Sequence, residues 1–232
     1  MGNKVANQKS KKKYNLINSK QSGLVQKDNL TICESNQTEY DQIRICHCPQ
    51  NSSKVCRVLL LGDVSVGKTS LASIINGCEE LVGDQYFETV GFEKSTLYME
   101  SHATTNHKIK IELYDLAGHE RFSYLTDVFL DKCDLIIYVF DLTTYDSFYK
   151  VQKLMTKLAQ YSIKSIIVGN KCDLVQSLCV SQFDIDIVRI KSDYPYCEIS
   201  VKYGTNINLL VNIIGNYILH NKNIAPMPDN TF

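Results

Sequence analysis

The sequence predicts an α/β fold in which helices cover both faces of a mainly parallel six-stranded sheet. Two observations lead to this prediction. From Val55 onward, apolar runs of strand length alternate with segments of helical length, as in sheets whose parallel strands are joined by helices. The 44% hydrophobic content is ordinary for a globular protein and allows a substantial core. Residues 1–54 differ, because they are rich in Asn, Gln, Lys and Ser without sustained periodicity, which predicts a disordered polar and basic extension. The alternative is a short docked element at Leu30-Thr31-Ile32 or Ile43-Arg44-Ile45.

The expected elements follow one another along the rest of the chain. KIKIELYD alternates apolar and polar residues as a strand does, and LIIYVFD is a continuous apolar run typical of a buried strand. Strands are expected at 55–61, 92–100, 108–115, 135–141, 165–171 and 196–200. Helices are expected at 69–77, near 145–160, near 181–191 and at 206–219. The folded domain therefore spans 55–222, and residues 223–232 are expected to form a flexible tail.

Composition narrows the class of protein. The 25 basic and 25 acidic residues give a net charge of zero, which argues against a nucleic-acid partner. Nine cysteines are scattered without a recurring CxxC pair, which is typical of a reduced cytoplasmic protein. We expect no metal at Cys46-His47-Cys48, because no second ligand pair stands at a suitable distance. The longest apolar run, 135–140, is far shorter than the ~20 residues of a membrane span.

The segment GDVSVGKT, residues 62–69, fits the phosphate-loop pattern GxxxxGK[ST] between an expected strand and helix. Its glycines let the backbone wrap around phosphates at the positive end of a helix. Lys68 suits terminal phosphate oxygens, and Thr69 presents a hydroxyl to the accompanying Mg²⁺. Asp115 closes an expected strand, with Gly118 three residues on, and nucleotide-bound Mg²⁺ needs such a carboxylate directly or through water. A chance glycine-rich turn is the alternative, which the strand–loop–helix context disfavours.

The segment NKCD indicates which base is bound. It directly follows the expected strand SIIVG, and its Asn170 amide can both donate and accept at a purine edge. Asp173 can accept two hydrogen bonds from guanine N1 and N2, a donor pair that adenine lacks. Lys171 can lay its aliphatic stem over the base. GTP or GDP is the expected ligand, and a P-loop ATPase or kinase is disfavoured.

This ordered set of motifs resembles the Ras-like small GTPases, and within them most nearly the Rab branch. The resemblance covers residues 55–220 and implies a P-loop small G domain. It rests on GDVSVGKTS (62–70), Thr89 in ETVGFE, YDLAGHERF (114–122), VFDLT (139–143), NKCDL (170–174) and EISVK (198–202). The segments VGFEKS and FLDKCD fit the Rab pattern less well.

The resemblance implies a role for each position that matches the family's motifs. Thr69 and Thr89 would ligate Mg²⁺, and Asp115 would hold it through water. The residues implied to bind GTP are Gly62, Asp63, Val64, Ser65, Val66, Gly67, Lys68, Thr69, Ser70, Gly118, Asn170, Lys171 and Asp173, with backbone groups of Ser200, Val201 and Lys202. The residues implied to act in catalysis are Lys68, Thr89 and His119, the last in place of the family's glutamine.

Three positions depart from the family. The glutamine that His119 replaces orients the attacking water, and histidine cannot donate and accept in the same geometry. An exposed switch residue without a catalytic role is the alternative for His119. Val64 stands where the family has glycine or another small residue, so it would crowd that glutamine and the arginine of a GTPase-activating protein. Near Leu81-Val82 the family places an aromatic against guanine, and Tyr86 or Phe87 would have to replace it.

The chain ends bear on membrane attachment. APMPDNTF contains no cysteine for prenylation, and the last cysteine is Cys197. MGNKVA offers Gly2 for myristoylation, although Ala6 misses the usual Ser or Thr. Because one myristoyl chain anchors weakly, a second signal is needed, and four lysines follow that could bind anionic lipid. These are Lys9, Lys11, Lys12 and Lys13. A solvated basic tail is the alternative.

Together these features predict a guanine-nucleotide-dependent switch of membrane traffic or signalling that hydrolyses GTP slowly. The alternative is a GTP-binding scaffold that hardly hydrolyses and holds one effector-binding state. Expected partners are effectors at the switch segments 80–92 and 115–130, an exchange factor and, as an open question, a GTPase-activating protein. The expected location is the cytoplasm, with the cytosolic face of a membrane as the site of peripheral attachment.

Overall fold

The computed structural model describes residues 43–46, 55–77, 88–101 and 108–220. Most of the predicted extension and the whole predicted tail, 223–232, lie outside the described residues. The strands are β1 (Ile43–Cys46), β2 (Val55–Leu61), β3 (Phe92–Ser101), β4 (Lys108–Leu116), β5 (Leu135–Asp141), β6 (Lys164–Asn170) and β7 (Tyr196–Glu198). The helices are α2 (Lys68–Ile75), α3 (Ser123–Leu130), α4 (Tyr145–Leu158), α5 (Gln182–Ser192) and α6 (Ile207–His220). None of these described helices is both long and apolar enough to cross a bilayer.

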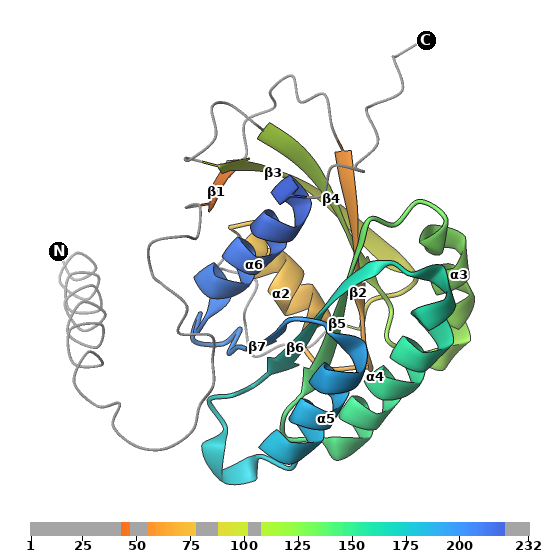
Figure 1. Cartoon of the computed structure of the whole chain (residues 1–232), viewed down its shortest axis with the longest axis vertical. Coiled ribbons are helices and arrows are strands. Elements are labelled where there is room, and N and C mark those ends of the chain that lie inside the picture. The colour runs from red at the N-terminus through yellow and green to blue at the C-terminus, as the bar shows by residue number, and fades with distance from the viewer. Residues whose placement is uncertain (1–42, 47–54, 78–87, 102–107, 221–232) are drawn as a thin grey trace, which may run out of the picture. The chain divides into compact units, whose positions relative to one another are not determined.

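The described strands form one sheet in the order β1-β3-β4-β2-β5-β6-β7 (Figure 1). Strands β4, β2, β5, β6 and β7 run parallel, whereas β3 is antiparallel to both of its neighbours, β1 and β4. The predicted α/β class with a mainly parallel sheet is therefore confirmed. All six expected strands are present, and the structure adds a seventh, β1, at the outer edge of β3.

The added strand corrects the boundary expected between extension and domain. Strand β1 lies within residues 1–54, which the composition predicts to be disordered, yet it pairs with the end of β3 from Ile43 opposite Ser101 to Cys46 opposite Tyr98. The Ile43 N–H donates to Asn212 Oδ1 of α6 (3.3 Å). Ile43 also fills space that Gly215 leaves open, since a Cβ on Gly215 would lie 2.6 Å from Ile43 Cγ1. The ordered domain therefore begins before Val55.

Each face of the sheet has its own buried core, and β2 contributes to both. Val58 and Leu60 belong to the core formed with α2 and α6, whereas Leu59 and Leu61 belong to the core formed with α3, α4 and α5 (Figure 1). Successive strand side chains point to opposite faces, so a continuous apolar run fills both cores. All four side chains are at most 4% exposed, which makes β2 a rigid support for the loop that follows it.

The carboxyl ends of the parallel strands lie at the same edge of the sheet. Leu60, near the end of β2, is in register with Asp115 of β4, and Asp141 of β5 is in register with Asn170 of β6. Open parallel sheets bind ligands at this edge. Segments far apart in the sequence therefore meet just beyond the end of β2.

Candidate nucleotide-binding site

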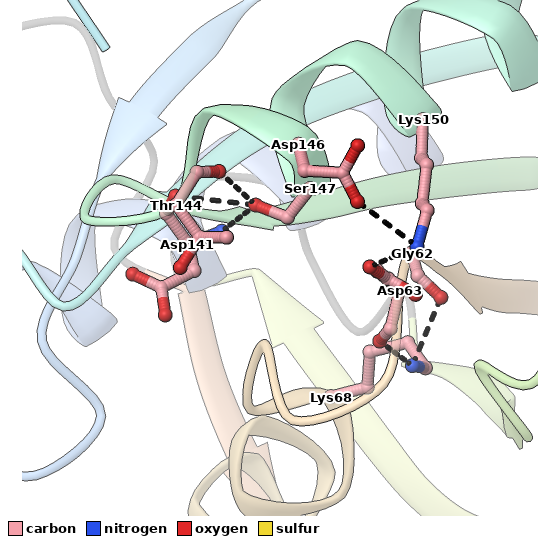
Figure 2. Close-up of polar contacts among 8 residues, drawn as sticks. All are labelled: Gly62, Asp63, Lys68, Asp141, Thr144, Asp146, Ser147 and Lys150. Carbon is pink, nitrogen blue, oxygen red and sulfur yellow. Dashed lines mark hydrogen bonds and ion pairs between the residues drawn. The ribbon is translucent and has the colours of Figure 1, made fainter. Parts of the chain in front are cut away.

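The loop between β2 and α2, residues 62–67, wraps around the ammonium of Lys68. The Nζ atom donates hydrogen bonds to the carbonyl oxygens of Gly62 (3.0 Å) and Asp63 (2.6 Å), as Figure 2 shows. Lys68 is 6% exposed, and burial lowers its pKa to about 8, although the carboxylates of Asp115 and Asp63 act in the opposite direction. A buried ammonium whose partners are neutral carbonyls is a favourable site for an anion. The loop therefore suits phosphate oxygens.

Asn170 joins the phosphate loop to the segment that follows β7. Its side chain lies so close to Gly67 that a Cβ there would be 2.3 Å from Asn170 Nδ2. The Nδ2 atom donates to the Val66 carbonyl (2.8 Å), and Oδ1 accepts from the Val201 N–H (3.1 Å). A side-chain amide has two N–H donors and an oxygen with two lone pairs. One donor and one lone pair therefore remain for a base.

The other two side chains of the predicted guanine segment differ in their partners. Lys171 forms an ion pair with Asp141 at the end of β5 (2.5 Å), and Asp141 also accepts from the N–H and hydroxyl of Thr143. Burial acts to raise the pKa of Asp141, but the hydrogen bonds from Lys171 and Thr143 lower it below its ordinary value. Asp173 is half-buried and has no hydrogen bond or ion pair among the described residues. Its oxygens are therefore available to a ligand.

The segment 200–202 is fixed largely by contacts within the protein. Ser200 is buried, and its backbone exchanges two hydrogen bonds with Thr205 (3.2 and 3.0 Å). The N–H of Val201 donates to Asn170, and exposed Lys202 places its Nζ 5.7 Å from the ring centre of Tyr203. The structure therefore brings this segment beside Asn170, as predicted, but its backbone N–H groups at Ser200 and Val201 already have partners.

Three oxygen-bearing side chains meet beside the phosphate loop. They are Thr69 in α2, Thr89 ahead of β3 and Asp115 in β4, and the two hydroxyl oxygens are 2.8 Å apart. Asp115 Oδ2 accepts from Thr69 (2.5 Å) and from Thr89 (3.4 Å). Burial raises the pKa of Asp115, against the effects of the Thr69 hydrogen bond and the Lys68 charge. The three predicted magnesium residues are thus brought together.

The second oxygen of Asp115 tests whether this cluster fits a metal ion. Asp115 is 2% exposed, and its Oδ1 is buried without a hydrogen-bond partner among the described residues. An unsatisfied buried acceptor is costly, so a cation or its bound water is the natural partner. Hydroxyl and carboxylate oxygens are the ligands that Mg²⁺ prefers, and it keeps several waters. The described residues contain no group of three or more His, Cys, Asp or Glu side chains suited to a metal, so this mixed cluster is the metal candidate.

Gly118, within the segment 115–130 predicted to be the second switch, touches the phosphate loop. A Cβ on Gly118 would lie 2.5 Å from the carbonyl of Asp63 and 2.6 Å from the nitrogen of Val64, so only glycine fits. The next residue, His119, is exposed, and its Nδ1 accepts the N–H of Arg121 (3.2 Å). Val64 is half-buried. The two departures from the family, Val64 and His119, therefore lie on either side of the Gly118 contact.

Some residues predicted to belong to the site lie outside the part of the chain that the structure describes, and two features of the site were not predicted from the sequence. Leu81-Val82, Tyr86 and Phe87 are outside the described residues, as are positions 80–87 of the first switch. Sequence reasoning gave Asp141 no role, although its place at the end of a strand could have indicated one. The ion pair between Lys150 and Asp63 was also missed, because a lysine in a helix carries no signal for a partner 87 residues away.

A phosphate loop that opens a helix at the end of a central parallel strand is the defining site of P-loop nucleotide-binding proteins. The neighbouring Asn170, Lys171 and Asp173 are the residues predicted to bind guanine. The chain belongs to the Ras family, which it matches over residues 57–220.

Comparison with individual proteins also indicates that the chain is related to Ras and Rab proteins. The chain is 30% identical to the Ras-related protein RABD2c of Arabidopsis thaliana over 154 residues, which are 65% of this chain and 74% of that protein. It is 31% identical to Ras-related protein Rab-1D of Dictyostelium discoideum over 156 residues, 65% and 73% of the two chains. Rab-26 of Rattus norvegicus is 28% identical over 173 residues, 73% and 66% of the two chains. The chain is thus a Ras-like small GTPase near the Rab branch, a class of GTP-binding switches that act in membrane traffic.

Proposed function

We propose that this protein is a magnesium-dependent GTP switch whose intrinsic hydrolysis is slow but still completes the cycle to GDP. The proposal rests on the difference, near the contact of Gly118 with the phosphate loop, between the groups suited to bind the nucleotide and the group at the water-orienting position. Lys68 and Asp115, which are suited to phosphate and Mg²⁺, are buried, whereas the water-orienting position holds an exposed histidine beside Val64. Among the described residues, the departures from the family, Val64 and His119, therefore lie where the attacking water would be oriented.

The binding step uses groups that are already in place. The Lys68 ammonium would exchange its two carbonyl partners for phosphate oxygens, and the loop N–H groups at the start of α2 would add further donors. Mg²⁺, when bound, would offset negative charge on the phosphates. Thr69, Thr89 and Asp115 would hold it, and Asp173 would accept from guanine N1 and N2.

The hydrolytic step requires an oriented water. Water attacks the γ-phosphorus, the bond from that phosphorus to the bridging oxygen breaks, GDP leaves with the electron pair, and the water's proton ends on phosphate. His119 Nδ1 accepts the Arg121 N–H, so only Nε2 is available, and one nitrogen cannot both donate to and accept from the reacting groups. The branched Val64 side chain restricts the same space. Both effects slow the attack, and Val64 also weakens the response to a GTPase-activating arginine.

The competing function is a scaffold that binds GTP and does not cycle. The switch and the scaffold are distinguished by the nucleotide that the purified full-length protein carries. Chromatography after acid denaturation identifies this nucleotide. Mainly GDP indicates a cycling switch, mainly GTP indicates the scaffold, and ATP would overturn both. Addition of EDTA should accelerate release of labelled GDP if Thr69, Thr89 and Asp115 hold Mg²⁺.

Partner proteins would bind where the nucleotide state is sensed. Family membership supports effector, exchange-factor and GTPase-activating partners as a class. We place the effector contact at the switch segments 80–92 and 115–130, because Thr89 and Gly118 are the residues that the γ-phosphate and Mg²⁺ would hold. Effector pull-down should therefore require a GTP analogue and should fail with GDP.

Membrane association is proposed from the sequence of the extension. Gly2 would carry a myristoyl group, and the basic cluster of Lys9, Lys11, Lys12 and Lys13 would bind anionic headgroups. Co-expression with an N-myristoyltransferase should raise the mass of the protein by one myristoyl group. An unchanged mass would contradict the proposal, and Gly2→Ala is the matched control.

A further inference from the structure

Helix α4 contributes a lysine to the phosphate loop. Lys150 Nζ lies 2.9 Å from Asp63 Oδ2 and 3.1 Å from Asp146 Oδ2, one turn earlier on the same helix (Figure 2). The Asp63 side chain is 19% exposed, and the Lys150 side chain is 39% exposed. The hydrogen bonds to Asp63 and Asp146 raise the pKa of Lys150, so the amine stays protonated. The loop and the helix are therefore joined by a charged contact.

Asp63 is the point of the phosphate loop where three other parts of the chain meet. Its carbonyl accepts from Lys68 (2.6 Å), and Gly118 packs against the same carbonyl. Its carboxylate pairs with Lys150. A shift of Asp63 would thus disturb both Lys68, which would bind the phosphates, and Gly118 in the predicted second switch.

A carboxylate in this loop is electrostatically unfavourable for the proposed ligand. GDP and GTP bring several negative charges into a partly buried site, where like charges repel more strongly than in bulk water. The Lys150 ammonium offsets the charge of Asp63, and Asp146 helps to fix the lysine in place. Without Lys150, an uncompensated carboxylate would remain beside the phosphates.

We propose that Lys150 is a positioning residue of the phosphate site, which neutralises the Asp63 carboxylate and ties the phosphate loop to α4. It acts through Asp63 and touches no nucleotide itself. Lys150 therefore strengthens binding of nucleoside di- and triphosphates without contributing to recognition of guanine. This inference rests on the proposed function only in requiring that guanine nucleotides bind.

The test compares Lys150→Met with Lys153→Met in the full-length protein. Lys153 lies on the same helix, its Nζ is 4.5 Å from the ring centre of Tyr149, and it has no acidic partner among the described residues. Both variants remove one positive charge, so the difference between them isolates the contacts of Lys150 with Asp63 and Asp146. We expect GDP to bind about three- to tenfold more weakly to Lys150→Met, and less than about twofold more weakly to Lys153→Met.

Three further readouts distinguish charge neutralisation from general loosening of the fold. Inosine diphosphate lacks the amino group that Asp173 would bind. The substitution Lys150→Met should weaken its binding by the same factor as the binding of GDP. Lys150→Arg should restore binding. Raising the salt from 0.1 M to 1 M shortens the Debye length from about 10 to about 3 Å, so it should reduce the defect of Lys150→Met.

A double-mutant cycle with Asp63 decides the mechanism. In an Asp63→Asn background, Lys150→Met should change GDP affinity by less than about twofold, because no carboxylate remains to be neutralised. An undiminished effect of Lys150→Met in that background would overturn the inference, as would equal affinities of Lys150→Met and Lys153→Met. Failure of the wild-type protein to bind GDP would instead contradict the proposed function.

Discussion

The residues suited to hold the nucleotide and the residue placed to orient the attacking water are supported very differently by the fold. Lys68, Asp115 and Asn170 are 6%, 2% and 3% exposed; Asp115 and Asn170 hydrogen-bond to other functional segments, and Lys68 to the loop that it follows. His119 is exposed, and its hydrogen bond is to Arg121, two residues along the same turn. These three binding residues are buried, whereas the hydrolysis position lies at the surface.

We therefore expect substitutions to separate binding from hydrolysis in this protein. A substitution at Asn170 removes hydrogen bonds that join two loops, so it affects folding as well as binding. A substitution at His119 leaves the core intact. Loss of the family's glutamine can therefore alter the chemistry at no cost to the fold.

The largest expected effect is loss of nucleotide binding in Lys68→Met. Removal of the charge-assisted contacts to phosphate should weaken GDP binding by about a hundredfold or more. The nucleotide-free variant should be as heat-stable as the wild type, because a buried ammonium with carbonyl partners carries its own desolvation cost. Fluorescence titration and thermal unfolding measure the two effects. Unchanged GDP affinity would contradict the assignment of Lys68.

Asn170→Ala should destabilise the protein even without nucleotide. The Val66 carbonyl and the Val201 N–H would each lose a partner, which should lower the free energy of unfolding by about 2–4 kcal/mol. His119→Ala should change it by less than about 0.5 kcal/mol. Urea unfolding of the two variants compares them directly, and equal effects would remove the distinction between a buried binding set and an exposed hydrolysis position.

The β1 contact should be independent of nucleotide binding. Ile43→Ala removes half-buried apolar surface and should cost about 1–2 kcal/mol. Gly215→Ala should destabilise the wild type, because its Cβ would overlap Ile43, but should be tolerated in the Ile43→Ala background. GDP affinity should stay the same in all three variants. Additive effects of the two substitutions, measured by urea unfolding, would show that Ile43 does not pack on Gly215.

The smallest effect is a change in acid stability set by Glu112, which lies three residues before Asp115 on β4. Burial acts to raise the pKa of Glu112, but hydrogen bonds from Lys94, Lys110 and Tyr114 outweigh it and hold the pKa at about 2, below the ordinary 4.5. A depressed pKa stabilises the fold above pH 4.5, and this contribution is lost as the pH falls towards 2.

The variant Glu112→Gln should therefore show a weaker loss of stability between pH 4.5 and 2 than the wild type does. Thermal unfolding across that range measures the effect, and Glu93→Gln serves as a control on an exposed carboxylate of β3. Parallel curves for wild type and Glu112→Gln would mean that the lysines do not hold the Glu112 charge. Glu112, whose charge is held by partners within the protein, would then no longer differ in this respect from Asp115, whose Oδ1 has no partner among the described residues.

Much of this arrangement could be predicted from the sequence, because its determinants are local. Apolar runs predict β2 and β5 whatever they pack against, and the segments 62–69 and 170–173 are contiguous. Parallel strands bring their carboxyl ends together, so the alternation of strands and helices is enough to predict that Asp115 and Asn170 lie at the same edge of the sheet as the phosphate loop.

The features that sequence reasoning missed depend on contacts between distant segments. Strand β1 has only two alternating isoleucines and is held by Asn212 and Gly215 of α6. Helix α3 was not expected either, since SYLTDVFL is short and is recognisable as a helix only from Leu130 buried against the sheet. The pairing of Lys150 with Asp63 could not be predicted either, because it also joins distant segments of the chain.

Single-turnover hydrolysis of GTP, measured together with GDP affinity in wild type and His119→Gln, shows whether binding is intact while the chemical step is slow. We expect tight binding in both proteins, slower hydrolysis in the wild type than in a Rab relative with glutamine at this position, and about a tenfold increase on His119→Gln. Val64→Gly should add to that increase. A wild-type rate equal to that of such a relative, with no change on His119→Gln, would contradict the proposed slow hydrolysis.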